Sequence, residues 1–203
     1  MQETIVDLIR HGEPVGGRMF RGSGCDHPLN AHGWQQMRAA LGDAAPWDQI
    51  LTSPMARCRE FALELAVRHH LPLAVEPQLC EVGMGRWEGR RPTEVAAAEP
   101  DAFADFLRDP LMHRPPEGER LEHLRARIGN AYDRQLAAWP GRHLLIVCHA
   151  GVTRALMGHL LNADALGWWR MRVDYAGLAR IRHGQHGASI EYFNAERIRP
   201  LNG

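Results

Sequence analysis

The chain has 203 residues, of which 45% are hydrophobic and 24% are charged, so it can bury a sizeable core and is not predicted to be disordered. Its 24 basic and 24 acidic side chains cancel, which argues against a nucleic-acid or acidic-membrane binder. The sequence contains no apolar run of transmembrane length and does not open with a basic, apolar leader, so we expect a cytoplasmic protein without membrane contact.

The cysteines and basic residues narrow the chemistry further. The four cysteines include no Cys-x-x-Cys pair, which favours reduced, mostly buried thiols over a disulfide framework or a zinc site. The sequence contains no lysine, so all 24 of its Lys and Arg residues are arginines. Any anion site must therefore use guanidinium, imidazole or backbone N–H groups.

The first part of the chain alternates short apolar strands with amphipathic helices. Asn30 is predicted to cap a helix that runs to Leu41, and Ser53 is predicted to cap the helix that follows the second strand. A glycine-rich loop follows the first strand. The predicted strands cover residues 4–9, 48–51 and 73–75.

The second part begins with a proline-rich stretch, residues 83–120, which we interpret as an insertion or cap over the sheet ends. It contains short helical patterns over residues 93–98 and 101–107. The elements predicted after it are a helix over 118–138, a buried strand over 142–148, a helix over 152–161, and strands over 177–182 and 188–193.

Alternating strands and helices predict an α/β fold with the architecture of a three-layer sandwich. A mostly parallel central sheet would carry helices on both faces. We expect a single domain over residues 1–203, with residues 83–120 as its insertion. In open parallel sheets, ligands bind at the carboxyl ends of the strands, so the site is expected there.

Chemically reactive side chains follow the predicted strands. Arg10 and His11 come directly after the first strand, and His149 comes directly after the buried strand over 142–148. Arg57 lies in the first turn of the helix after the second strand, and Glu81 lies beyond the third. We expect these five side chains to converge on one edge of the sheet.

The tripeptide Arg-His-Gly occurs twice, at residues 10–12 and 182–184. A tripeptide alone is weak support for a function. The second copy lies between two strand patterns and is predicted to form an exposed hairpin turn. The first copy follows a buried strand and opens a glycine-rich loop, so only the first is a candidate site.

Four segments together resemble the histidine phosphatase (phosphoglycerate mutase-like) superfamily, with matching order and spacing between about residues 5 and 182. They are Arg10-His11-Gly12-Glu13, Ser53-Pro54-Met55-Ala56-Arg57, the stretch from Glu81 to Gly89, and Cys148-His149-Ala150-Gly151. Further segments resemble the α-ribazole phosphatase branch, namely residues 6–13, 20–23, 33–37 and 87–90 and the prolines at 110, 115 and 116. The resemblance implies a phosphoglycerate mutase-like fold.

The resemblance also implies a phosphomonoester hydrolase with His11 as nucleophile. A ring nitrogen of His11 would form a phosphohistidine, while a backbone carbonyl holds the other nitrogen. Arg10 and Arg57 would bind the phosphate, and His149 would donate to it as an imidazolium. This scheme requires no cofactor and no metal.

The remaining roles come from the same resemblance. Glu81 is the predicted general acid for the leaving oxygen and then the base for water, with Glu88 and Glu13 as competing carboxylates. Glu88 is the more structural of the two competitors, and Glu13 is a candidate for orienting an arginine. Arg21 and Gly22 are further predicted substrate-binding residues.

One departure from the family pattern concerns phosphate binding. Many relatives have Asn four or five residues after the Arg-His-Gly-Glu motif, where this chain has Pro14-Val15-Gly16-Gly17-Arg18. The contact is therefore missing, or it comes from Arg18, Arg21 or backbone N–H groups. The chain also lacks the longer insertions of the glycolytic mutases, which favours hydrolysis.

The predicted substrate is a small phosphomonoester, with α-ribazole 5′-phosphate of cobalamin nucleotide-loop assembly first. The first alternative is a broad-specificity phosphatase for sugar phosphates or phosphoserine. A phosphoglycerate mutase, or a non-catalytic relative that binds phosphorylated ligands, ranks below it. Four side chains are candidates for a flat apolar surface against benzimidazole, although core packing is the more usual role of each: Met19, Phe20, Met84 and Trp87. The oligomeric state stays open.

Overall fold

A computed structural model, which describes residues 3–201, places six strands in one sheet in the order β3-β2-β4-β1-β5-β6. Strands β1 to β4 pair in parallel, and β5 and β6 form an antiparallel hairpin beside β1. The predicted mostly parallel sheet is confirmed. The strands are β1 (Thr4–Arg10), β2 (Gln49–Thr52), β3 (Leu73–Val75), β4 (His143–Cys148), β5 (Leu178–Gly184) and β6 (Gly187–Ala195).

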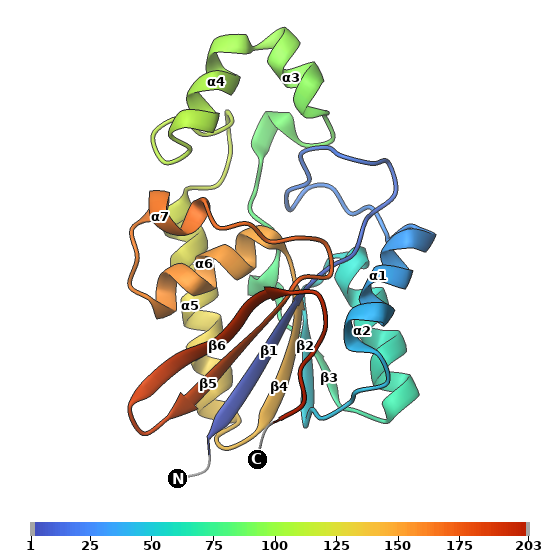
Figure 1. Cartoon of the computed structure of the whole chain (residues 1–203). Coiled ribbons are helices and arrows are strands. Elements are labelled where there is room, and N and C mark those ends of the chain that lie inside the picture. Colours follow the sequence, from blue (N-terminus) through green and yellow to red (C-terminus); the bar gives the residue numbers. More distant parts are fainter. Residues whose placement is uncertain (1–2, 202–203) are drawn as a thin grey trace.

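Helices cover both faces of the sheet, as the three-layer architecture requires (Figure 1). One face packs against α1 (Ala31–Leu41) and α2 (Ala56–His69), and the other packs against α5 (Leu121–Ala138), α6 (Ala150–Leu160) and α7 (Ala165–Trp169). Within residues 3–201, no helix is both long and apolar enough to cross a membrane.

Strand β4 shows why the central strands are continuously apolar. Every residue of β4 is buried. Leu144 and Ile146 belong to the core shared with α5 and α6, whereas Leu145 and Val147 belong to the core shared with α1 and α2. Alternate side chains point to opposite faces of a strand, so in a sheet covered on both faces successive residues are buried and most of them are apolar.

The two predicted helix caps have different outcomes. The prediction for Asn30 is confirmed, because its side chain accepts a hydrogen bond from Gly33 N at 2.7 Å. The prediction for Ser53 is wrong, because α2 begins three residues later at Ala56. The N–H of Ala56 donates to Asp26 Oδ1 at 2.6 Å, so an acceptor from a distant loop serves the start of this helix.

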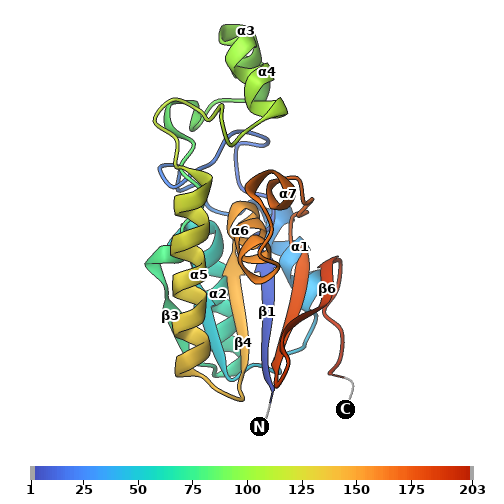
Figure 2. The ribbon, with the colours of Figure 1, turned by 90° about the vertical axis from the view of Figure 1, so that its left-hand side faces the viewer.

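The insertion contains α3 (Pro92–Ala98) and α4 (Pro100–Arg108), which stand beyond the carboxyl edge of the parallel strands (Figures 1 and 2). Two short 3₁₀ turns precede them, at Pro77–Leu79 and Gly85–Trp87. An aromatic cluster joins this segment to the loop after β1. The ring of Phe20 lies 5.3 Å from Trp87 and 6.1 Å from Phe106 between centroids.

The second Arg-His-Gly copy is partly as predicted. A hairpin is present, but Arg182 and His183 lie within β5, and the turn consists of the next two residues after Gly184. His183 Nε2 lies 2.6 Å from the hydroxyl oxygen of Tyr132 in α5. This copy therefore joins the hairpin to a helix and is remote from the strand ends where β1 and β4 meet.

A buried charge network ties β1 to the antiparallel hairpin and to β4. Asp7 is fully buried, and its carboxylate accepts hydrogen bonds from Arg180 Nε at 2.7 Å, Trp47 Nε1 at 2.9 Å and His143 Nε2 at 2.8 Å. Burial alone would raise the pKa of Asp7, but the hydrogen bonds from His143 and Arg180 outweigh it and lower that pKa.

Asp7→Asn is expected to reduce the free energy of unfolding at pH 7 by about 3–5 kcal/mol, because it removes the buried carboxylate that lies 2.7 Å from Arg180 and leaves this arginine with the more distant Glu191 at 3.8 Å. Since the folded-state pKa of Asp7 lies below the unfolded value, its stabilisation is present above about pH 4 and is lost as the pH falls through the lowered pKa. Urea unfolding at pH 7 and pH 3 measures both effects.

The matched control is Asp43→Asn, because Asp43 forms an exposed ion pair with Arg68. An exposed pair contributes about 0.5 kcal/mol, so this variant should unfold almost like the wild type. An Asp7→Asn penalty that is equal at pH 7 and pH 3 would contradict the assigned electrostatic role.

Candidate active site

The parallel pairing of β1 with β4 brings two histidines together at the carboxyl edge of the sheet. Arg10 is the register partner of Cys148, and the next residue, His11, donates its N–H to Cys148 O at 2.9 Å. The rings of His11 and His149 are 5.1 Å apart between centroids and meet edge to face. Both side chains are buried, so they face each other out of bulk water.

The ring of His11 is held in one tautomer. Its Nδ1 lies 2.7 Å from the carbonyl oxygen of Gly12, which only accepts, so Nδ1 carries the proton and Nε2 keeps its lone pair. The predicted backbone carbonyl partner is confirmed. Burial, together with the positive charges of Arg10 and Arg57, holds the pKa of His11 well below its usual value.

His149 lies in surroundings that disfavour a positive charge on its ring. Burial, followed by the positive charge of Arg57, holds the pKa of His149 well below its usual value when no phosphate is bound. Its role as an imidazolium beside a dianionic phosphate stays a prediction. Its Nε2 lies 2.7 Å from Ser53 Oγ. Ser53 therefore orients His149 and does not cap α2.

Arg10 is fixed from two sides. Its NH1 donates to Val173 O at 2.7 Å, and its guanidinium carbon lies 4.1 Å from the ring centroid of Tyr175. The Tyr175 ring is itself 5.9 Å from the ring of His11. These contacts hold the Arg10 guanidinium beside the histidine pair.

Arg57 approaches the same place from the first turn of α2 and is fully buried. Its guanidinium donates to Cys25 O at 2.8 Å and to Gly22 O at 3.5 Å. Among residues 3–201, the buried Nε atoms of Arg10 and Arg57 have no hydrogen-bond partner. Buried cationic donors that lack acceptors are well suited to a phosphate group.

The structure places Arg21 and Gly22 near His11 and Arg57, but the contacts that they make there stabilise the loop after β1. Arg21 NH2 donates to Val15 O at 2.6 Å, which closes the loop after β1. A side chain at Gly22 would collide with the carboxylate of Glu88 and with backbone atoms near Met84, so close packing requires glycine there. Their roles as substrate-binding residues stay predictions.

The three candidate carboxylates lie in different surroundings. Glu81 is buried, and its carboxylate accepts hydrogen bonds from the backbone N–H groups of Val82 at 2.9 Å and Gly151 at 3.2 Å. Gly151 lies in the first turn of α6, and this helix begins directly after His149. Glu88 accepts from Met84 N at 2.9 Å and packs against the loop after β1.

Glu13 does not orient an arginine, since the side-chain partner of its Oε1 is Asn30 Nδ2 at 3.1 Å. Among the three, Glu81 is the carboxylate that binds the first turn of α6, the helix that begins after His149. Its negative charge also acts on Arg10, whose pKa burial lowers and Glu81 partly restores. The geometry therefore favours Glu81 over its two competitors.

Tyr175 and Val173 are site residues that sequence reasoning missed. They precede β5, a strand that the sequence predicts without indicating which strand it pairs with or in which direction. Because β5 runs antiparallel to β1, its first residue, Leu178, pairs with Ile9 at the carboxyl edge of β1. The loop before such an antiparallel strand therefore lies at the site. The pairing direction of the strand must be known before this position can be inferred.

Comparison with known proteins agrees with this geometry. Residues 6–196 match the family model described as the histidine phosphatase superfamily (branch 1). The chain belongs to the histidine phosphatase superfamily.

Three similar proteins show how varied this superfamily is. The bifunctional protein Rv2228c of Mycobacterium tuberculosis is 31% identical over 92% of this chain, but the chain spans about half (52%) of its length. The crystal structure of the α-ribazole phosphatase from Shigella flexneri is 26% identical, with a TM-score of 0.84 over 98% of this chain and 100% of that one. The mycobacterial glucosyl-3-phosphoglycerate phosphatase Rv2419c is 25% identical, with a TM-score of 0.82 over 96% of this chain and 100% of that one.

A polar cleft of about 880 Å³ opens beside Arg10 and Tyr175. Of the four side chains considered for a flat apolar surface, only Met19 lines it, because Trp87 and Met84 are buried in the core and Phe20 packs onto that core. The lining residues are Arg10, Glu13, Gly17, Arg18, Met19, Arg172, Asp174 and Tyr175.

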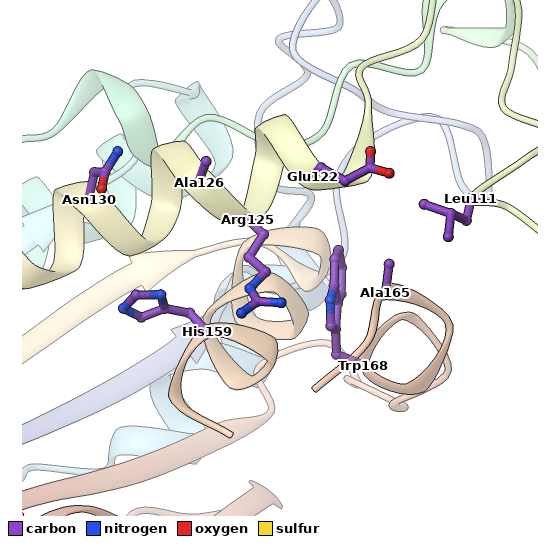
Figure 3. Close-up of a pocket in the computed structure, with 8 residues that line it drawn as sticks. All are labelled: Leu111, Glu122, Arg125, Ala126, Asn130, His159, Ala165 and Trp168. Carbon is purple, nitrogen blue, oxygen red and sulfur yellow. The ribbon is translucent and has the colours of Figure 1, made fainter. Parts of the chain in front are cut away.

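A second hollow, of about 440 Å³, lies between α5, α6 and α7 and contains none of the candidate catalytic side chains (Figure 3). Arg125 and His159 reach into it from α5 and α6, with Trp168 of α7 beside them. Arg125 is already bound to Ala163 O at 3.0 Å and Asn162 Oδ1 at 3.1 Å. These contacts give it a structural role in holding the turn before α7.

Tyr175→Ala is expected to lower kcat/KM for p-nitrophenyl phosphate about tenfold, because a desolvated cation–π contact contributes about 1–2 kcal/mol to holding Arg10. Tyr175→Phe keeps the ring face and should stay within about threefold of the wild type. Steady-state kinetics of the two variants separate the ring from the hydroxyl. Equal losses in both variants would show that the hydroxyl, and not the ring, matters.

The low pKa of His11 predicts that this ring stays unprotonated in the free protein at neutral and mildly acidic pH. In an NMR titration, the His11 ring signal, assigned by its loss in His11→Gln, should shift only well below pH 6.5. Arg57→Met should move the midpoint upward, because it removes a positive charge near the ring. A wild-type midpoint at or above 6.5 would rule out this electrostatic description.

Proposed function

We propose that this chain hydrolyses phosphomonoesters through a phosphohistidine formed on His11. The observation that carries the proposal is the hydrogen bond from His11 Nδ1 to Gly12 O, which leaves Nε2 as a nucleophile. Arg10 and Arg57 lie near it, and their buried Nε–H groups have no hydrogen-bond partner within residues 3–201. A neutral imidazole between two guanidinium groups suits attack on a dianionic phosphate, because the cations offset the charge of the phosphate.

The proposed reaction has two displacements. In the first, His11 Nε2 forms a bond to phosphorus while the ester P–O bond breaks, and Glu81 gives a proton to the leaving oxygen. In the second, Glu81 takes a proton from water, the water oxygen attacks phosphorus, and the P–N bond breaks to release inorganic phosphate. His11 and Glu81 end each cycle in the state in which they began.

The other site residues would stabilise charge during both steps. Arg10 and Arg57 supply guanidinium donors to the phosphoryl oxygens, which carry most of the negative charge of the transition state. His149, oriented by Ser53, provides a further polar group on the facing strand. Arg21 and Gly22 are further proposed substrate-binding residues.

The insertion has a proposed role as well. In the proposed single domain over residues 1–203, residues 83–120 form a cap over the active site. The position of α3 and α4 beyond the carboxyl edge supports this proposal (Figure 2). The packing of Phe20 on Trp87 supports it further, because Phe20 belongs to the loop that also carries Arg21.

Two substrate candidates follow from different observations. The sequence motifs and the similarity to the Shigella α-ribazole phosphatase support α-ribazole 5′-phosphate, and with it a role in cobalamin synthesis. The polar lining of the cleft favours the second candidate, a small phosphorylated sugar or acid, because the expected apolar surface around Trp87 is buried. The similarity to a glucosyl-3-phosphoglycerate phosphatase is compatible with this second candidate.

His11→Ala is expected to lower turnover of p-nitrophenyl phosphate at least about 1,000-fold, because the variant lacks the nucleophile. The measurement is steady-state phosphate release, with circular dichroism to verify folding. His123→Ala is the matched control, since His123 is an exposed residue of α5 and should leave turnover unchanged. A folded His11→Ala variant with wild-type turnover would exclude the covalent route.

A further inference from the structure

The cleft beside the active site is the place where the alcohol part of a bound phosphomonoester must lie. Two loops form it, one after β1 and one before β5. Arg10 and Tyr175 belong both to its wall and to the surroundings of His11. A phosphate held at His11 therefore has its ester group directed toward the remaining lining residues.

The charges of that lining are not balanced. Asp174 is engaged by Arg172 Nε at 2.8 Å and by Asn194 Nδ2 at 2.8 Å, and Glu13 is engaged by Asn30. Arg18, in contrast, is an exposed lining residue whose guanidinium forms no hydrogen bond or ion pair within residues 3–201. One guanidinium group of the cleft is thus free to bind an anion.

The backbone holds Arg18 on the wall of the cleft. Gly16 and Gly17 adopt positive φ values of +87° and +67°, which turn the loop sharply just before Arg18. Arg21 NH2 donates to Val15 O, so a hydrogen bond joins the residues on either side of the segment that contains Arg18. The loop is anchored again by the N–H of Val15, which donates to Pro28 O at 3.0 Å.

The lining also disfavours an aromatic base. Within residues 3–201, Met19 is the one aliphatic side chain that lines the cleft, and Arg10 covers one face of the Tyr175 ring, with its guanidinium carbon 4.1 Å from the ring centroid. Stacking a flat heterocycle requires an open aromatic or aliphatic face. An arginine without a partner instead suits a carboxylate, which it can bind through two parallel hydrogen bonds.

We propose that the cleft selects phosphomonoesters whose alcohol part carries a carboxylate, and that Arg18 binds this second anionic group. Arg172, which lines the cleft from the other loop, adds positive charge near it. The inference rests on the proposed phosphatase function and selects the second of its two substrate candidates. Arg18 is accordingly a specificity-determining residue, separate from the groups that bind the transferred phosphate.

A matched pair of substrates tests this assignment. 3-Phosphoglycerate and glycerol 3-phosphate differ only in that a carboxylate replaces a hydroxymethyl group. The wild type should show a kcat/KM at least about tenfold higher for 3-phosphoglycerate, because a site built for a polar group discriminates against the analogue that lacks it. In Arg18→Ala the ratio should fall below about threefold.

Two controls complete the experiment. Arg197→Ala removes one exposed positive charge outside the cleft lining and should keep the wild-type ratio, which separates a local contact from general charge attraction. α-Ribazole 5′-phosphate, which carries no carboxylate, should lose no more activity in Arg18→Ala than glycerol 3-phosphate does.

Each contrary outcome has a definite meaning. A wild-type ratio near one, or a preference for α-ribazole 5′-phosphate, overturns the inference while the hydrolase stands. Equal losses for both substrates in Arg18→Ala also overturn it, because they place Arg18 on the transferred phosphate. Absence of turnover with every substrate, including p-nitrophenyl phosphate, overturns the proposed function and the inference with it.

Discussion

The site depends on the parallel pairing of β1 with β4. This pairing sets Arg10 opposite Cys148 and joins His11 N to Cys148 O, so the residues after the two strands meet at one point. His11 and His149 are far apart in sequence, yet the sheet holds their rings 5.1 Å apart. Any change that shifts this register by one residue would turn the site residues toward the opposite face.

The site is also constrained by the positive charges of Arg10 and Arg57, which lie close to two buried histidines. Burial and neighbouring arginines lower the pKa values of both His11 and His149, so the histidines are neutral among cations. Arg10 is held by Tyr175 and Val173, and Arg57 by two backbone carbonyls, yet the Nε of each guanidinium is buried and has no hydrogen-bond partner in the part of the chain that the structure describes. A bound phosphate would supply the missing acceptors, which links the unliganded geometry to the proposed chemistry.

Local patterns in the sequence predict the strands, the Asn30 cap and the convergence of His11 and His149, because these follow from periodicity and from strand ends. The sequence does not reveal that Asp26 serves the start of α2, which frees Ser53 to hold His149. It also does not reveal Tyr175, whose placement depends on the antiparallel direction of β5. Phe20 and Trp87 illustrate the same limit, since only tertiary packing distinguishes a core aromatic from a substrate surface.

The most direct test of this account is to trap the covalent intermediate. The protein would be quenched in alkali during turnover of a radiolabelled phosphomonoester, and its peptides would be mapped for bound phosphate. The account predicts base-stable, acid-labile phosphate on the peptide that contains His11. Turnover without any covalent phosphate, or with the label on a different residue, would contradict it.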